Sequence, residues 1–257
     1  MPLSPFAPID RWLAPAPDPA RVAWIEGTTF AHRGLHGAGA PENSPSAFRA
    51  AIARGFGIEC DIQRSRDGQA MVFHDWELDR LTVETGPVLG RTAAELGTIP
   101  LSGSSDSIPA LREVLDLVAG QAPLLIEVKS KRDMRISAVC LAVRNVLQGY
   151  RGNHAVMSFD PRVSRWFADH APATVRGLVV TEEGARTLSG MARRRLALWH
   201  AKPDFLAWDI RDLPSTLPAT QRRRGLPVAT WTVRSAELAE RAALHADAPI
   251  AEGAGIA

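Results

Sequence analysis

The chain has 257 residues, of which 46% are hydrophobic, and a formal net charge of +2. This length suits one large domain with a substantial core, and so small a net charge gives no indication of a nucleic-acid partner. Two cysteines are too few for a disulfide framework, and no apolar stretch approaches the roughly 20 residues needed to cross a bilayer. We therefore expect a cytoplasmic protein without stable membrane insertion, and the sequence leaves a homo-oligomer open.

The first 27 residues are rich in proline and alanine and predict an arm packed on the outside of the domain. Trp12 and Trp24 are its expected anchors. Prolines and charged residues such as Asp10 interrupt every apolar run in this arm, so a cleaved secretory signal is not expected. Residues 28–257 are predicted to form the domain itself.

From residue 28 onward, strand-like and helix-like runs alternate. We predict strands over 28–32, 57–62, 123–129, 153–158, 174–180, 204–208, 226–232 and 247–251, with a short hairpin partner at 70–74. The helices are predicted over 44–55, 109–119, 134–149, 161–169, 184–199, 214–224 and 235–245. Eight strands alternating with helices at this length are typical of an α/β protein with a (β/α)8 TIM barrel. A doubly wound open sheet is the competing fold, but no glycine-rich dinucleotide or phosphate-loop spacing supports it.

Residues 75–108 interrupt this alternation after the second strand. They are polar, contain several glycines, and are expected to hold no strong core segment. So long an excursion inside a compact domain is usually functional. We therefore assign this insertion a part in the function.

Charged side chains lie on two of the predicted barrel strands. Glu59 and Asp61 are two residues apart and so point to one face of their strand, as do Glu127 and Lys129. Buried carboxylates are costly unless they are paired or bind a cation. Three acids without a cysteine favour Mg²⁺ or Ca²⁺. The alternative is a pair of buried salt bridges, Glu59 with Arg33 and Glu127 with Lys129.

Two histidines, His32 and His74, come at the ends of strand-like runs, and barrel active sites lie at the carboxyl ends of the strands. Imidazoles titrate near neutral pH and suit general acid–base catalysis. Zinc ligation is the alternative, but it calls for a His-x-His pair, whereas Arg33 follows His32. Arg33 and Lys129 are suited to bind phosphate oxygens. His36 is expected on the surface.

Two runs of three arginines, 193–195 and 222–224, lie in predicted helices. No aromatic residues are interleaved with them, as they would be in a nucleic-acid-binding patch. We expect both runs to be solvated helix faces and no nucleic acid to bind.

Several spaced blocks of the sequence resemble the glycerophosphodiester phosphodiesterases. The main blocks are Ala31-His32-Arg33-Gly34, Pro41-Glu42-Asn43-Ser44, Ile58-Glu59-Cys60-Asp61-Ile62, Val72-Phe73-His74-Asp75, Ile126-Glu127-Val128-Lys129 and Thr230-Trp231-Thr232-Val233. The resemblance runs from about residue 29 to 235, and several blocks in the right order are more specific than any one of them. Cys60 stands where the family usually has leucine, and the segment after Asp247 departs from the family pattern.

The resemblance implies a barrel of the phospholipase C-like phosphodiesterase type that hydrolyses glycerophosphodiesters to sn-glycerol 3-phosphate and an alcohol. It implies one divalent cation, Mg²⁺ or Ca²⁺, held by Glu59, Asp61 and Glu127. The insertion at 75–108 would shape the glycerol end of the pocket.

The resemblance also implies roles for the polar residues around the acids. His32 and His74 would act as acid and base. Substrate and phosphate would be bound by Arg33, Lys129 and Trp231. Glu42 and Asn43 would organise the loop after the first strand.

Two other functions are compatible with such a barrel. One is a phospholipase D-like hydrolysis of lysophospholipid head groups, which predicts an exposed apolar lip formed by Leu78, Leu81, Val83 and Leu89. The other is a non-catalytic phosphodiester-binding module. Such a module is expected to lack one of the histidines or acids, and this chain has them all.

Overall fold

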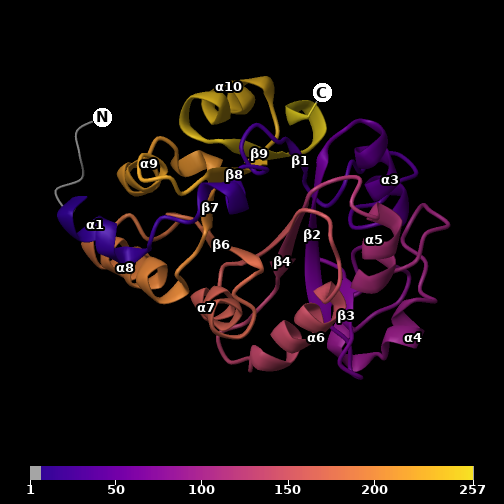
Figure 1. Ribbon diagram of the computed structural model, residues 1–257. Coiled ribbons are helices and arrows are strands. Elements are labelled where there is room, and N and C mark those ends of the chain that lie inside the picture. The colour runs from indigo at the N-terminus through magenta and orange to yellow at the C-terminus, as the bar shows by residue number, and fades with distance from the viewer. Residues whose placement is uncertain (1–6, 257) are drawn as a thin grey trace. The chain divides into compact units, whose positions relative to one another are not determined.

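The computed structural model, drawn in Figure 1, describes residues 7–256. These residues form two compact units. The first unit comprises residues 30–154 and the second comprises residues 7–29 and 155–256. Along this part of the chain, eight strands that pair in parallel within each unit alternate with helices. The fold is the predicted (β/α)8 barrel.

The first unit contains three of the parallel strands. These are β1 (Phe30–Ala31), β2 (Gly57–Arg64) and β4 (Leu124–Val128), in the spatial order β1-β2-β4. A short strand, β3 (Ala70–Val72), pairs antiparallel with β2, as predicted. The helices of this unit are α3 (Pro45–Ala53), η1 (Val88–Gly90), α4 (Ala93–Leu96), α5 (Leu111–Val118) and α6 (Ser137–Leu147).

The second unit contains the other five parallel strands, in sequential order. They are β5 (His154–Ser158), β6 (Val175–Val180), β7 (Phe205–Asp209), β8 (Val228–Val233) and β9 (Ala248–Ala251). Its helices are α1 (Ala7–Leu13), α2 (Pro19–Val22), α7 (Pro161–His170), α8 (Leu188–Ala201), η2 (Ile210–Asp212), α9 (Thr216–Arg222), α10 (Ala236–His245) and η3 (Gly253–Gly255).

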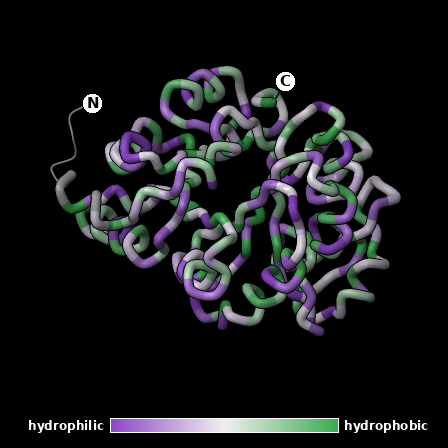
Figure 2. The backbone as a smooth tube through the Cα atoms, viewed as in Figure 1, coloured by the Kyte–Doolittle hydropathy of each residue, from purple (hydrophilic) through white to green (hydrophobic). Residues whose placement is uncertain are grey.

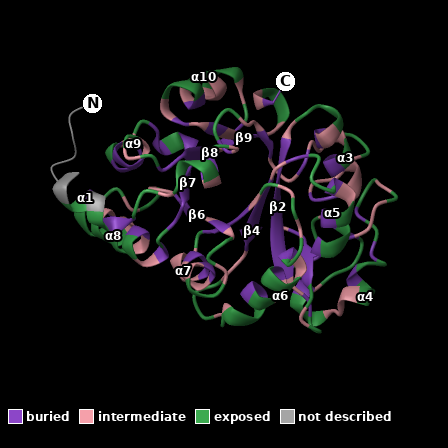
Figure 3. Ribbon diagram, in the orientation of Figure 1, coloured by how far each residue is buried: buried purple, intermediate pink, exposed green. Residues whose placement is uncertain are grey.

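Every predicted strand and helix is present, and the bounds differ by only a few residues. Local signals explain the accuracy: Ser44 caps α3 by accepting a hydrogen bond from the backbone N–H of Ala47 (3.1 Å), and Pro45 occupies the first helical position. The strands are buried and the helices are exposed on one side (Figure 3). The helices accordingly carry both hydrophilic and hydrophobic residues (Figure 2). Within the described range, no helix combines the length and the hydrophobicity that crossing a bilayer requires.

The insertion at 75–108 has a hydrophobic core, so the expectation that it holds no strong core segment is wrong. Six of its apolar side chains pack together with Met71 and Phe73 of the first unit. They are Leu78, Val88, Leu96, Ile99, Leu101 and Ile108. The insertion is therefore folded around its own apolar side chains, which also pack on Met71 and Phe73 just before it.

The arm is held by different residues from those predicted. Trp12 is 72% exposed, so it is not an anchor. Trp24 is half-buried, and its indole N–H donates to the carbonyl of Arg21 (2.9 Å). The buried side chains of the arm include Leu13, Ala14, Val22 and Ile25, together with the charged Asp10.

Four arginines of the two arginine runs make specific contacts with other parts of the protein, two of them with the arm. Arg195 donates to the carboxylate of the fully buried Asp10 (3.0 Å), and Arg224 donates to the Asp10 carbonyl (3.0 Å). Arg194 donates to the carbonyl of Ala185 and Arg222 to the carboxylate of Asp247. The expectation of solvated faces is therefore wrong for these four arginines.

Replacing Asp10 by alanine is expected to destabilise the fold by about 3 kcal/mol, because removing one partner of a buried ion pair leaves the other charge uncompensated. Urea unfolding should show a lower midpoint with an unchanged slope. Asp18→Ala is the matched control, since Asp18 only caps α2 at the surface by accepting from the N–H of Ala20. We expect it to cost about 1 kcal/mol or less. Equal losses in the two variants would contradict the role given to Asp10.

Candidate active site

Three buried carboxylates lie together on the neighbouring strands β2 and β4. Glu59 and Asp61 flank Cys60 on β2 and so point to the same face, and Asp61 is the register partner of Glu127 on β4. Each of the three carries a carboxylate oxygen within 4.8 Å of the others. The structure thus brings Glu59, Asp61 and Glu127 together in one acidic cluster.

The ammonium of Lys129 lies between two of these acids. Its Nζ is 2.8 Å from Asp61 Oδ1 and 2.8 Å from Glu127 Oε1. Burial tends to raise the pKa of Asp61, but the positive charges of Lys129 and Arg33 outweigh it and lower this pKa to about 2. Burial raises the pKa of Glu127, whereas the carboxylates of Asp61 and Glu127 raise the pKa of Lys129 against the effect of burial. Asp61 is therefore the firmly ionised member of the cluster.

Glu59 is the least satisfied of the three acids. Its Oε2 accepts a hydrogen bond from the backbone N–H of Arg33 (3.0 Å), but within the described residues its buried Oε1 has no hydrogen-bond partner. Burial, and then the charges of Asp61 and Glu127, raise the pKa of Glu59 well above its ordinary value. A buried carboxylate oxygen without a partner is costly. The donor set of three carboxylates therefore fits a hard divalent cation, which would satisfy that oxygen.

Of the two buried salt bridges that the alternative interpretation predicts, only one is present. Glu127 does pair with Lys129, but Glu59 accepts from the backbone of Arg33 and not from its guanidinium. That guanidinium instead donates to Glu42 (2.7 Å) and lies 3.4 Å from Asp61.

Two amide side chains hold the site together: Asn43, which was expected to organise the loop after the first strand, and Gln63, which the sequence analysis did not identify. Asn43 donates to Asp61 Oδ2 (2.9 Å) and accepts from the Asp61 N–H (3.2 Å). The side-chain amide of Gln63 donates to the carbonyls of Phe73 (3.2 Å) and His74 (3.1 Å). Gln63 continues the alternation of Glu59 and Asp61 along β2, and this was the signal that could have found it.

The two predicted catalytic histidines lie in the loops after β1 and β3. His32 Nε2 is 4.0 Å from Glu59 Oε2. His74 Nδ1 is 2.6 Å from Asp75 Oδ1. Burial, helped by the charges of Lys129 and Arg33, lowers the pKa of His74, so its imidazole is neutral at pH 7.

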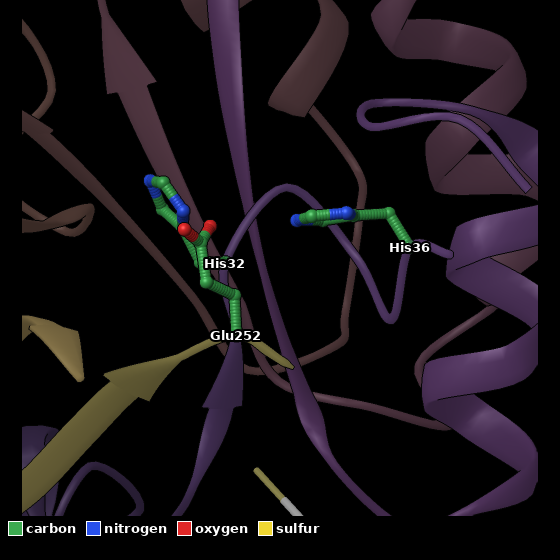
Figure 4. A group of neighbouring side chains, drawn as sticks. All are labelled: His32, His36 and Glu252. Atoms are coloured by element: carbon green, nitrogen blue, oxygen red, sulfur yellow. The ribbon is translucent and has the colours of Figure 1, made fainter. Parts of the chain in front are cut away.

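A third imidazole, that of His36, is half-buried and not on the surface as expected. One of its ring nitrogens lies within 4.8 Å of a ring nitrogen of His32 (Figure 4). Glu252, also drawn in that figure, follows β9 in the second unit and accepts a hydrogen bond from Arg234 (2.6 Å).

A cleft of about 440 Å³ opens beside His74 in the first unit. Its lining includes Asp75, Trp76, Arg80 and Lys129. The cleft gives small molecules access to the imidazole of His74.

Trp231, the remaining predicted site residue, belongs to β8 in the second unit. Its indole N–H donates to the carbonyl of Ala207 (2.9 Å), and its ring packs edge-on against Phe159 with centroids 5.2 Å apart. The role of Trp231 in substrate binding stays a prediction.

Comparisons with known proteins agree on one family. A family profile described as the glycerophosphoryl diester phosphodiesterase family matches residues 32–250. A glycerophosphodiester phosphodiesterase of Bacillus altitudinis is 38% identical over 41% of this chain and 45% of its own length. One from Caldanaerobacter subterraneus is 36% identical over 39% of this chain and 44% of its own length. The matched segments thus span somewhat less than half of these two relatives.

Two solved structures resemble most of the described fold. A phosphodiesterase of Oleispira antarctica, in complex with the product sn-glycerol 3-phosphate, has a TM-score of 0.77 at 22% identity and covers 88% of this chain and 93% of its own. A glycerophosphodiester phosphodiesterase of Thermotoga maritima has a TM-score of 0.70 at 24% identity, covering 87% and 94%. At these identities the likeness shows a shared fold.

Proposed function

This chain belongs to the glycerophosphoryl diester phosphodiesterase family, and from that membership we propose that it hydrolyses glycerophosphodiesters to sn-glycerol 3-phosphate and an alcohol. The observation that carries the proposal is the convergence of Glu59, Asp61 and Glu127 in one buried cluster. The related Oleispira antarctica enzyme binds sn-glycerol 3-phosphate as its product, which supports the same product here. We also propose that the protein acts in the cytoplasm.

We propose that the acidic cluster holds one divalent cation, Mg²⁺ or Ca²⁺. The unpartnered Oε1 of Glu59 and the raised pKa of that carboxyl both support a bound positive charge. When bound, such a cation would neutralise the charge that develops on the phosphoryl oxygens.

We assign the base to His74 and the acid to His32. The lowered pKa of His74 keeps its imidazole neutral at pH 7, so it can take the proton from the attacking oxygen. His32 would protonate the leaving alkoxide.

Arg33 and Lys129 are proposed to bind the phosphate. Both are already paired with carboxylates, Arg33 with Glu42 and Lys129 with Asp61 and Glu127. A guanidinium has five N–H donors and an ammonium three, so each can also donate to a phosphate oxygen. The carboxylates hold these side chains in place before substrate arrives.

The phospholipase D-like alternative loses part of its support. Of the four residues proposed for an apolar lip, Leu78 is buried and Leu81 is partly buried in the core of the insertion. Val83 and Leu89 are exposed. Two exposed aliphatic side chains are common on soluble proteins and mark no lipid-binding surface.

We expect glycerophosphocholine to be turned over much faster than lysophosphatidylcholine, because the insertion presents no continuous apolar lip for an acyl chain. The measurement is release of sn-glycerol 3-phosphate, followed with a coupled dehydrogenase, against release of choline from the lysolipid. Preferred turnover of the lysolipid would support the alternative. If no phosphodiester is turned over with any of the candidate cations, the result would instead favour a non-catalytic phosphodiester-binding module.

A further inference from the structure

One guanidinium, that of Arg80 in the insertion, makes two forked contacts with carboxylates. Its Nε and Nη2 donate to the two oxygens of Asp75 (2.5 and 3.0 Å). Its Nη1 and Nη2 donate to the two oxygens of Glu42 (2.9 and 2.7 Å). Forked arginine–carboxylate pairs fix geometry as well as charge. Arg80 therefore ties the loop after β1 to the loop after β3.

Each of these carboxylates also contacts a residue of the candidate active site. Glu42 accepts from the guanidinium of Arg33 (2.7 Å), and Asp75 lies 2.6 Å from Nδ1 of His74. A continuous chain of ion pairs and hydrogen bonds thus runs from Arg33 through Glu42, Arg80 and Asp75 to His74.

The contact between Asp75 and His74 decides which ring nitrogen carries the proton. Hydrogen bonds from Arg80, and then from His74, lower the pKa of Asp75 to about 2, so it is a carboxylate at neutral pH. A carboxylate only accepts hydrogen bonds, so the neutral imidazole must place its proton on Nδ1. Nε2 of His74 then carries the free lone pair.

Arg80 itself has little capacity left for substrate. Its hydrogen bonds to Asp75 and Glu42 use four of the five N–H donors of a guanidinium. The side chain is also half exposed at the edge of the cleft. These features indicate that Arg80 positions other residues and does not bind the substrate itself.

We propose that Arg80 is a positioning residue that holds Asp75 where it fixes the Nδ1–H tautomer and the ring direction of His74. This inference rests on the proposed function to the extent that His74 is the catalytic base.

The first test compares Arg80→Met with wild type, using two independent readouts. We expect kcat on glycerophosphocholine to fall about 10- to 100-fold with little change in KM, the usual loss when a residue that orients a catalytic group is removed. In ¹⁵N-labelled protein, the His74 ring signals should change from the Nδ1–H tautomer to a mixture. Arg66→Met is the matched control, because Arg66 is similarly exposed and pairs with Glu95 away from His74. Neither readout should move in it.

A second test separates positioning from general damage to the fold. Asp75→Asn should lower kcat, and Arg80→Met added to Asp75→Asn should cause little further loss, because both changes act through the same contact. Additive losses would overturn the proposal. So would a raised KM and weaker inhibition by sn-glycerol 3-phosphate in Arg80→Met with an unchanged His74 tautomer, since Arg80 would then bind substrate directly.

The tautomer measurement also distinguishes failure of this inference from failure of the proposed function. If wild type hydrolyses no phosphodiester, the proposed function fails, while the ring signals of His74 still report whether Arg80 fixes its tautomer. If wild type is active and the His74 signals are the same in Arg80→Met, the role given to Arg80 is wrong.

Discussion

Replacing His74 with alanine is expected to lower kcat on glycerophosphocholine by about 10³-fold, because no side chain then accepts the proton of the attacking oxygen. In wild type the rate should also fall as the pH is lowered through the pKa of His74, which lies below the ordinary value of 6.5. The sign follows from the role: the protonated ring cannot act as a base. This acidic limb should disappear from the pH profile of His74→Ala.

His32→Ala should lose activity by a similar factor, since the leaving alkoxide would lack its proton donor. His170→Ala is the control: His170 is exposed at the end of α7 and stacks on Trp166. Circular dichroism and thermal melting should match wild type in all three variants. Near-normal turnover in either His32→Ala or His74→Ala would remove that histidine from the mechanism.

Removing divalent cations is expected to abolish activity, and adding back Mg²⁺ or Ca²⁺ is expected to restore it. A readout independent of turnover is the melting temperature, because a ligand that binds only the folded state stabilises it by about 2.7 kcal/mol at 100 times its Kd. The cation should raise the melting temperature of wild type and should fail to do so in Glu59→Gln. Asp116→Asn, at an exposed position on α5, should respond as wild type does.

In the absence of a cation, Glu59→Gln is expected to raise the stability of the fold. The folded state raises the pKa of Glu59, so the fold prefers the protonated form and loses stability as the pH rises through that pKa. Glutamine resembles the protonated acid, so the cation-free variant should be more stable than cation-free wild type at pH 7. A melting temperature of wild type that no cation shifts, together with full activity in chelator, would contradict the metal proposal.

The barrel and the acidic cluster could be predicted because local spacing determines them. Glu59 and Asp61 converge since alternate residues of a strand share a face, and parallel pairing of β2 with β4 brings Glu127 beside them. The same alternation places Gln63 on this face of β2, but an uncharged amide gives no sign in the sequence that it belongs to a site.

Other features depend on contacts between residues far apart in the sequence. Arg80 pairs with Glu42, which precedes it by 38 residues, and Asp10 pairs with Arg195, 185 residues later. No spacing rule connects such pairs. The core of the insertion was missed for a related reason: its apolar residues are scattered between turns and follow neither a helical nor a strand period.

Cys60 lies between the two acids of β2, yet its side chain is fully buried, and burial raises the pKa of its thiol well above the usual range. Cys140 on α6 is buried as well. A thiol in this state is a poor nucleophile. Electrophiles that modify cysteine should therefore react only slowly with this protein in its folded state, and a selective inhibitor would have to contact the buried carboxylates and their basic partners instead.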